Sequence, residues 1–424
     1  MIINQKIRLK FIDEESKNSI DRCSSLCNKM YNMLLEECKN DYENNNDSKN
    51  LLHGRSLRNY IVSIKKEHPY FYFVHSSPLK NVAFRLKEAY LYFFAGSGYP
   101  KFRSNRIKWF SLLYDEPNKG IKIENKNLKI SLGYELKDGI KVRKYAYAHL
   151  YEKVRKGVIR NFRITKEKDE YYIVVCLEKE DKEVVKGDRV ISLDLNHKNF
   201  FVGIDNKGKS VEFENLFQIK YFDEEIDKVK AKRDKCLRKS IKCINEYGNV
   251  YHKPSRRYSR LNKALEKLYY RRRAQIKDGL YLIAHRLCDN YDVIAIGDYS
   301  PSISNSPQKN MHRKMLNQSV IAMFRKILTN VCYKRRKQLI IVDETDTTKE
   351  CFCCGDKNHK DPSIREYTCP KCGKTYNRDI NSAINIGKKA KVLSSSDYVS
   401  LDLTKPTYIA RYNLFKQSIS TIIK

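Results

Sequence analysis

The chain has 424 residues, and its 84 Lys and Arg against 50 Asp and Glu give a formal net charge of +34. This length exceeds that of one ordinary domain, and a hydrophobic share of 41% excludes a wholly disordered chain. Because so large a surplus of positive charge attracts polyanions, we expect nucleic acid or an anionic membrane surface as a partner.

The sequence carries no sign of membrane insertion or export. No apolar run approaches the ~18 residues that a spanning helix needs, and the opening residues, MIINQKIRLKFIDEE, lack the apolar stretch of a signal peptide. We therefore expect a cytoplasmic protein associated with the nucleoid, or a nuclear protein if the host is eukaryotic. In such compartments the 13 cysteines serve as thiols or metal ligands rather than disulfides.

The first 180 residues predict a small β unit interrupted by helices. Apolar and polar side chains alternate over residues 1–11, which is the pattern of a strand. From about 16 to 94 the apolar spacing becomes helical, and residues 120–180 return to strands as hairpins around 125–127 and 166–170. The β unit ends at the charged link EKEDKEVVKGD.

The second half of the chain predicts an α/β domain. The sequence RVISLDLNHKNFFVGIDNKGKSVEFEN is typical of three strands with tight turns, and a long basic helical region follows from about 222 to 287. Two almost wholly apolar strands come next, YDVIAIGD and KRRKQLIIVDE, with a helical segment between them. Continuous apolar strands joined by helical crossovers indicate a sheet covered on both faces. This order of elements is that of an RNase H-like domain, although other α/β folds share parts of it.

Two CxxC pairs, each followed by glycine, predict a structural zinc site. Four thiolates in two such turns match the tetrahedral coordination of one Zn²⁺. The predicted ligands are Cys351, Cys354, Cys369 and Cys372. Cys353 is expected to be a free thiol, because it cannot coordinate beside its neighbour without strain, and His359 is a reserve ligand. A ribbon of this kind holds shape and catalyses nothing by itself.

Acidic residues at the ends of buried segments predict a second kind of metal site. Asp194 ends the strand VISLDL, and Asp379 opens a helix in NRDINSAINI, where helix capping is its alternative role. A third acid follows a late strand, either Asp298 after VIAIG or Glu344 after LIIVD. Carboxylates that converge from separate strands in a very basic protein favour two Mg²⁺ or Mn²⁺ ions acting on a phosphodiester.

One stretch of the basic helical region predicts a surface that binds nucleic acid. Between Lys253 and Lys277 there are ten Lys and Arg but one acid, Glu266, whereas a solvated helix face normally mixes charge signs. We expect this stretch to follow a phosphate backbone; a merely solubilising face is the alternative. The predicted contacts are Arg256, Arg257, Arg260, Lys263, Lys267, Arg271, Arg272 and Arg273. The polar segment SPSISNSPQKNMHRKMLNQ, with His312 and Arg313, is expected to form a lid beside the acidic site.

Several motifs together resemble one known family. SLDLNHKNFFVGIDNKG, IGDYS, VDETDTTKECFCCG and YTCPKCGKTYNRDINSAINI are similar in sequence, order and spacing to the transposon-encoded TnpB family. Relatives of that family are the eukaryotic Fanzor proteins and the miniature type V CRISPR effectors. The resemblance covers roughly residues 188–390. The amino-terminal half matches in layout and in fragments such as GYPKFRSN, and the tail after about residue 390 has no recognisable match.

The resemblance implies an α+β multidomain protein. An amino-terminal β wedge with an inserted helical recognition region would precede an RNase H-like (RuvC) α/β nuclease domain that carries a zinc-ribbon insert. The expected boundaries are 1–15 and 105–187 for the wedge, 16–104 for the recognition region, 188–345 and 377–390 for the RuvC domain, and 346–376 for the zinc ribbon. Residues 391–424 form a carboxy-terminal tail of unknown role.

Residue by residue, the resemblance departs from the family at one position. Asp194 and Asp379 fall on the first and third RuvC acids, but Gly297 stands where most of the family has the glutamate of the second motif. A branch of the family carries a glutamate just before the zinc cysteines instead, and that residue here is Glu344. We expect Glu344 to reach across the neighbouring strand, about 4.7 Å away, along a path that Gly297 leaves clear. Asp298 is the alternative, although a regular strand would turn it to the opposite face.

The function that the resemblance implies is that of an RNA-guided DNA endonuclease. A guide RNA would pair with target double-stranded DNA beside a short flanking motif, and two Mg²⁺ or Mn²⁺ ions would promote hydrolysis of a phosphodiester. One Zn²⁺ would be structural, no membrane would be involved, and a monomer is favoured over a dimer. Two alternatives remain. One is a catalytically inactive RNA-guided DNA-binding protein, such as a repressor, and the other is an unguided structure-specific nuclease or transposase accessory protein.

Overall fold

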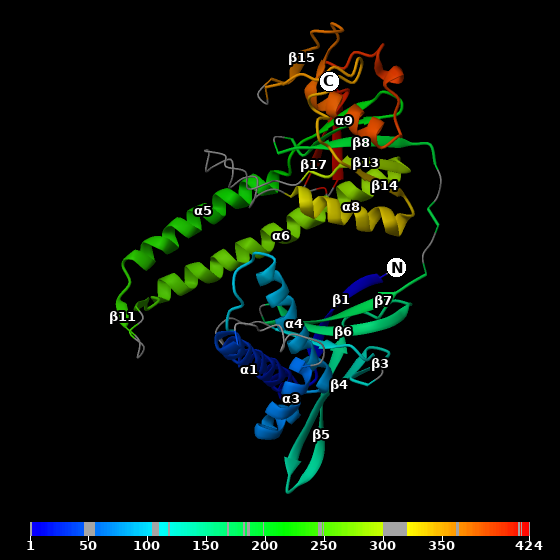
Figure 1. Ribbon diagram of the computed structural model, residues 1–424. Coiled ribbons are helices and arrows are strands. Elements are labelled where there is room, and N and C mark those ends of the chain that lie inside the picture. The colour runs from blue at the N-terminus through cyan, green and yellow to red at the C-terminus, as the bar shows by residue number, and fades with distance from the viewer. Residues whose placement is uncertain are drawn as a thin grey trace. The chain divides into compact units, whose positions relative to one another are not determined.

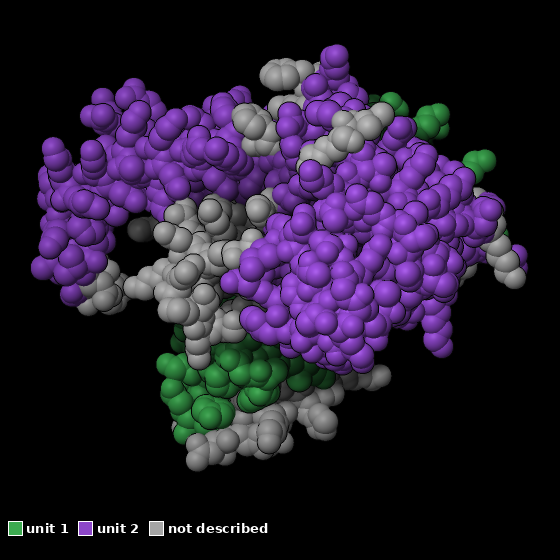
Figure 2. All heavy atoms as spheres, turned by 90° about the horizontal axis from the view of Figure 1, so that it is seen from above, with its two compact units in different colours: residues 1–181 green, residues 182–424 purple. Residues whose placement is uncertain are grey.

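The computed structural model describes residues 2–45, 56–103, 110–117, 119–167, 169–180, 183–184, 187–197, 199–244, 248, 250–299, 320–361, 364–413, 416 and 418–423. Contacts within the chain divide it into two compact units, residues 1–181 and 182–424, which Figure 2 colours green and purple. The segment predicted as a lid, with His312 and Arg313, lies outside the described residues. No helix in the described ranges is long and apolar enough to cross a bilayer.

The first unit is built on a seven-stranded antiparallel sheet (Figure 1). Its strands lie in the order β2-β6-β7-β1-β5-β4-β3. Their bounds are β1 Ile2–Phe11, β2 Ser111–Tyr114, β3 Ile121–Glu124, β4 Asn127–Lys137, β5 Ile140–Leu150, β6 Val158–Glu167 and β7 Glu170–Glu178. In β1, Ile7 and Leu9 are buried while Lys6, Arg8 and Lys10 are exposed, which confirms the predicted alternation.

Helices enter this unit between β1 and β2 of the chain. They are α1 Glu14–Asn45, α3 Ser56–Glu67, α4 Ser76–Phe94 and the 3₁₀ helix η1 Pro69–Phe73. Their apolar side chains share one core with the sheet, in which Cys23, Cys27 and Cys38 are buried. The predicted arrangement, a β unit interrupted by helices, is confirmed.

The second unit contains an RNase H-like sheet, as predicted. Its seven strands lie in the order β14-β13-β8-β9-β10-β17-β18. Strand β13 is parallel to both β8 and β14, whereas β9 is antiparallel to β8 and β10. The bounds are β8 Val190–Leu195, β9 Phe201–Asp205, β10 Ser210–Phe213, β13 Val293–Gly297, β14 Gln338–Val342, β17 Tyr408–Asn413 and β18 Ser418–Ile423. The remaining elements are α5 Phe217–Arg238, β11 Lys242–Ile244, β12 Val250–His252, α6 Arg256–Asn290, α8 Ile321–Arg335, β15 Glu366–Thr368, β16 Thr375–Asn377, α9 Arg378–Lys389 and the 3₁₀ helix η3 Ser395–Tyr398.

The basic helical region is not continuous, so the prediction of one long helical stretch was wrong in that respect. Helix α5 ends at Arg238, α6 begins at Arg256, and the short hairpin of β11 and β12 lies between them (Figure 1). The side chain of Ser255 caps α6 by accepting a hydrogen bond from the Tyr258 N–H at 3.1 Å. Pro254 before it has no N–H with which to continue a preceding helix.

The tail of unassigned role completes the sheet of the second unit. Strand β17 pairs in parallel with β10, and β18 pairs antiparallel with β17. Ala410 and Tyr412 of β17 are buried in the same core as α6 and α8. Strands β17 and β18 therefore belong to the RNase H-like domain rather than to a separate appendage.

Helices cover both faces of this sheet, and that arrangement positions the acidic site. Helices α6 and α8 share a core with Ile191 and Leu193 of β8. Helix α9 packs on the other face, where Ile380 and Ile384 join Val190 of β8. Because side chains alternate along a strand, Asp194 projects from β8 on the face that α9 covers.

Candidate metal centres and nucleic-acid interface

The acidic site lies where the carboxyl ends of three parallel strands meet the start of α9. Gly297 of β13 pairs with Val342 of β14, and the β13–β8 register ends one residue before Asp194. Asp194, Gly297 and Val342 are therefore neighbours in that order across the sheet. Glu344 lies two residues beyond Val342, on the same face, and Asp379 lies in the first turn of α9.

Asn377 caps the start of α9. Its side-chain oxygen accepts hydrogen bonds from the N–H groups of Asp379 at 2.9 Å and Ile380 at 3.3 Å. The side chain of Asp379 is therefore available for another role. It is 4% exposed and ion-paired with Arg365, from the segment between the two cysteine pairs, and with Arg378.

Asp194 lies at the centre of the acidic group. Ser382, one turn after Asp379 on α9, donates a hydrogen bond from Oγ to Asp194 Oδ1 at 3.2 Å. Burial raises the pKa of Asp194 well above its usual value, and repulsion from Asp379 and Glu344 raises that pKa further. The structure thus brings these three predicted acids together, at a place where negative charge is costly without a cation.

Glu344 reaches this group by crossing β13 at Gly297. A Cβ atom placed on Gly297 would overlap Glu344 Oε2 and would lie 3.0 Å from its Cβ and 3.1 Å from its Cδ. Burial, followed by repulsion from Asp298, raises the pKa of Glu344 to about 7. Within the described residues, Oε2 has no hydrogen-bond partner. A buried carboxylate oxygen without a donor suits the ligand of a cation.

The alternative acid, Asp298, is exposed just after β13. Its Oδ1 accepts the backbone N–H of Glu344 at 3.3 Å, and its own N–H donates to the carbonyl of Val342 at 2.9 Å. These contacts hold the backbone that carries Glu344.

Polar residues of α9 that the sequence analysis did not single out tie the acidic site to the cysteine segment. Ser382 Oγ lies 3.2 Å from Thr347 Oγ1, which donates to the carbonyl of Glu344 at 2.8 Å. The side-chain amides of Asn381 and Asn385 donate to the carbonyl of Glu350, each at 2.8 Å. Helical spacing within NRDINSAINI could have found them, because residues three or four apart share one face of a helix.

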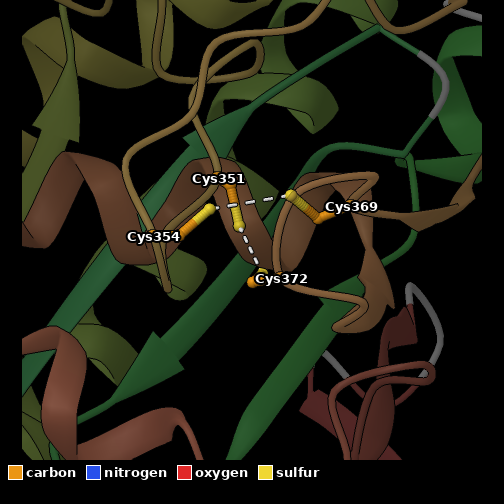
Figure 3. A group of neighbouring side chains, drawn as sticks. All are labelled: Cys351, Cys354, Cys369 and Cys372. Carbon is orange, nitrogen blue, oxygen red and sulfur yellow. Dashed lines mark hydrogen bonds between the residues drawn. The ribbon is translucent and has the colours of Figure 1, made fainter.

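The four predicted zinc ligands, Cys351, Cys354, Cys369 and Cys372, gather at one point (Figure 3). Their sulfur atoms all lie within 4.8 Å of one another. The glycines after each pair donate their N–H groups back to the carbonyls of Cys351 and Cys369, both at 2.9 Å. Gly355 and Gly373 adopt φ of +74° and +70°, which favours glycine. Four thiolates at this spacing fit tetrahedral Zn²⁺.

Cys353 and His359 are described residues that lie outside this cysteine cluster. A nearby cation is buried instead: Lys360 is 6% exposed, and its Nζ lies 4.9 and 5.0 Å from the ring centroids of Tyr367 and Tyr376. Because four thiolates and one Zn²⁺ carry a net negative charge, an ammonium group here offsets part of it.

The predicted nucleic-acid-binding residues lie along the first half of α6. The four residues Arg256, Arg260, Lys263 and Lys267 line one groove. The side of α6 that faces α5 is apolar, with Leu265 packed against Phe222 and Ile226. Arg272 differs from the other seven predicted contacts, which are exposed: it is half-buried, and its Nε donates to Asp223 of α5 at 2.8 Å. Arg272 therefore joins the two helices.

Comparison with known proteins matches the region that carries the cysteine cluster, Glu344 and Asp379. The family described as Cas12f1-like, TNB domain, matches residues 322–386. The TnpB-like proteins L79 and R854 of Acanthamoeba polyphaga mimivirus are each 33% identical to the chain over 157 residues. That match spans 35% of this chain and 30% and 29%, respectively, of the two relatives.

A solved structure extends the likeness in fold. The protein of a Cas12f1–sgRNA–target DNA complex aligns with a TM-score of 0.58 over 89% of this chain and 83% of its own length. The sequence identity of the two is 16%, so this likeness concerns the fold.

Proposed function

We propose that the chain is a TnpB-family RNA-guided DNA endonuclease that hydrolyses a phosphodiester with two divalent metal ions, and its similarity to TnpB-like proteins and to the Cas12f1-like TNB domain supports this. The observation that carries the proposal is the convergence of Asp194, Glu344 and Asp379 from β8, the end of β14 and the start of α9. Three carboxylates, of which Asp379 is buried and the other two are partly buried, favour a site for cations and phosphate over a structural ion-pair network in a chain of net charge +34.

Asp194, Glu344 and Asp379 would hold the ions, Mg²⁺ or Mn²⁺, since all three offer hard oxygen ligands. When bound, two such ions stabilise the attacking and leaving oxygens of the phosphodiester. Ser382 orients Asp194 through its 3.2 Å hydrogen bond. Arg365 and Arg378 balance the charge of Asp379 in the structure. A cation held by Asp379 would take over that role from Arg365.

The cysteine cluster would hold one structural Zn²⁺. Its proposed role is to fix the segment that leads from Glu344 to α9, because the short ribbon has little core of its own. The hydrogen bonds from Asn381 and Asn385 to this segment link the ribbon to the helix that carries Asp379.

The proposed macromolecular partners are a guide RNA and target double-stranded DNA, with the chain acting as a monomer. The exposed basic groove of α6 supports such partners, since Arg256, Arg260, Lys263 and Lys267 follow one helix face at intervals that suit successive phosphates. Base pairing with the guide would then read the sequence, and the protein would read shape and a short flanking motif.

Sequencing the RNA that co-purifies with the protein, followed by cleavage of matched DNA, tests this proposal. We expect one discrete structured RNA and Mg²⁺-dependent cutting of DNA that matches its guide portion. Asp194→Ala should abolish cutting and leave RNA binding intact, because Asp194 holds ions rather than nucleic acid. A discrete RNA without cutting by the wild type would indicate an inactive DNA-binding protein. Cutting without any bound RNA would indicate an unguided nuclease.

A further inference from the structure

Glu344 is the acid of this site that must reach across a neighbouring strand. It follows the outer strand β14 and must cross β13 before it meets Asp194. A glutamate side chain has three rotatable bonds, whereas metal ligands must be held within about 0.5 Å of a productive position. Something other than Glu344 must therefore fix the direction of its carboxylate.

The residue after Asp298 provides that restraint. The backbone N–H of Tyr299 lies near the Glu344 carboxylate, where it partly offsets the rise in the pKa of that group. Arg325 of α8 then holds Tyr299 in place, since its Nη2 donates to the Tyr299 carbonyl at 3.1 Å. The charge of Arg325 also favours the ionised form of Glu344. The guanidinium group of Arg325 thus holds Tyr299 in place and also favours the negative charge of the Glu344 carboxylate.

Further contacts tie the same loop to the ends of the neighbouring strands. The Tyr299 hydroxyl lies 3.0 Å from Nε2 of His197, which follows β8, and the two rings pack edge to face with centroids 5.4 Å apart. On the other side, Asp298 binds the backbone N–H of Glu344. The loop after β13 is therefore held by groups from β8, α8 and the end of β14.

We propose that Tyr299 and Arg325 are positioning residues for Glu344, with the Tyr299 N–H directing the carboxylate and Arg325 fixing Tyr299, so that Oε2 remains free for a metal ion. This inference rests on the proposed function, since it assigns a purpose to Glu344 as a ligand. It adds α8 to the elements that build the metal site.

Replacing Arg325 by Met, with Lys326→Met as the matched control, tests the proposal. Lys326 is the exposed neighbour of Arg325 on α8, so its loss removes the same charge without touching the loop. We expect Arg325→Met to raise the Mg²⁺ concentration for half-maximal cleavage by about tenfold, the usual effect of removing an outer partner of a metal ligand. Arg325→Lys, which keeps the charge, should recover part of the loss. An unchanged Mg²⁺ requirement in a folded Arg325→Met variant would overturn the proposal.

Binding of Mn²⁺, measured by electron paramagnetic resonance, separates this inference from the proposed function. If the wild type binds Mn²⁺ but cuts no DNA, the proposed function fails while the inference still predicts weaker binding in Arg325→Met. In a protein that already carries Glu344→Gln, adding Arg325→Met should not weaken Mn²⁺ binding any further. An equal loss in both backgrounds, or no Mn²⁺ binding by the wild type, would refute the positioning role.

Discussion

Gly297 lies so close to the carboxylate of Glu344 that any larger residue at 297 would occupy the space of that carboxylate. The glycine sits at the carboxyl end of β13, between Asp194 on β8 and Val342 on β14. Glu344 follows the outer strand β14, so it can cross β13 only if the residue at position 297 has no side chain. The position of the Glu344 carboxylate therefore depends on the glycine at position 297.

Gly297→Ala should displace Glu344 and reduce cleavage by about a hundredfold, the upper range for disturbing the support of a metal ligand. Gly279→Ala is a suitable control, because a Cβ there lies 3.3 Å from Leu216 and 3.4 Å from Tyr412, where only slight adjustment is needed. Rates at saturating Mg²⁺ and melting temperatures of both variants check the prediction. Wild-type cleavage by Gly297→Ala would show that the two residues are independent.

Asp194→Asn should stabilise the metal-free protein while abolishing cleavage. The pKa of Asp194 is raised in the folded state, so the folded protein binds a proton more tightly than the unfolded chain. Stability is therefore lost as pH rises from about 3.8, the usual pKa of Asp, toward the raised value. At pH 8 we expect a melting temperature about 2–4 °C above that of the wild type, or about 1 kcal/mol, with a smaller gain at pH 5. Mg²⁺ should reduce this gain, because it stabilises the wild type more; a lower melting temperature at pH 8 would contradict the account.

Removal of zinc should weaken the nuclease through the ribbon rather than through the carboxylates. Cys351→Ser or Cys372→Ser should lower zinc content, loosen the segment bound by Asn381 and Asn385, and reduce cleavage. Cys353→Ser should retain both zinc and activity, since Cys353 lies outside the cluster. Metal analysis of the purified variants gives the direct measurement. Stoichiometric zinc in Cys372→Ser would disprove the assigned ligand set.

The basic groove of α6 should contribute salt-dependent affinity for nucleic acid. Changing Arg256, Arg260, Lys263 and Lys267 to Gln should reduce the slope of log affinity against log salt by about 0.7–0.9 per lost phosphate contact. Arg272→Gln should instead lower the melting temperature, because it breaks the partly buried pair with Asp223. Filter binding across a salt series distinguishes the two effects, and an unchanged slope in the fourfold variant would identify the groove as a solubilising face.

Periodicity and spacing predicted much of this fold. The alternation in β1, the apolar strands β13 and β14 and the CxxC pairs depend on local chemistry that a sequence displays directly. The break between α5 and α6 was missed, although Gly248 and Pro254 between the two helices are local signs of a turn. The joining of β17 to β10 was missed as well, since strand pairing between residues about 200 apart leaves no local trace.

The acidic site was predictable in part. The positions of Asp194 and Asp379 follow from their motifs, and the path of Glu344 follows from strand order and the glycine at 297. The contacts of Arg325 with Tyr299 and of Arg365 with Asp379 arise from tertiary packing of separate elements. No periodicity within one segment encodes such contacts.

Cleavage by Glu344→Gln and Asp298→Asn, assayed side by side in Mg²⁺ under identical guide loading, tests the central claim most directly. Glutamine keeps the size of Glu344 but removes the charge that balances the ions, so cutting should fall by at least about a hundredfold. Asn at 298 still offers Oδ1 to the Glu344 N–H, so cutting should stay within about tenfold of the wild type. If Asp298→Asn is inactive and Glu344→Gln cuts, Asp298 is the third acid. If both variants cut like the wild type, the site of three carboxylates is refuted.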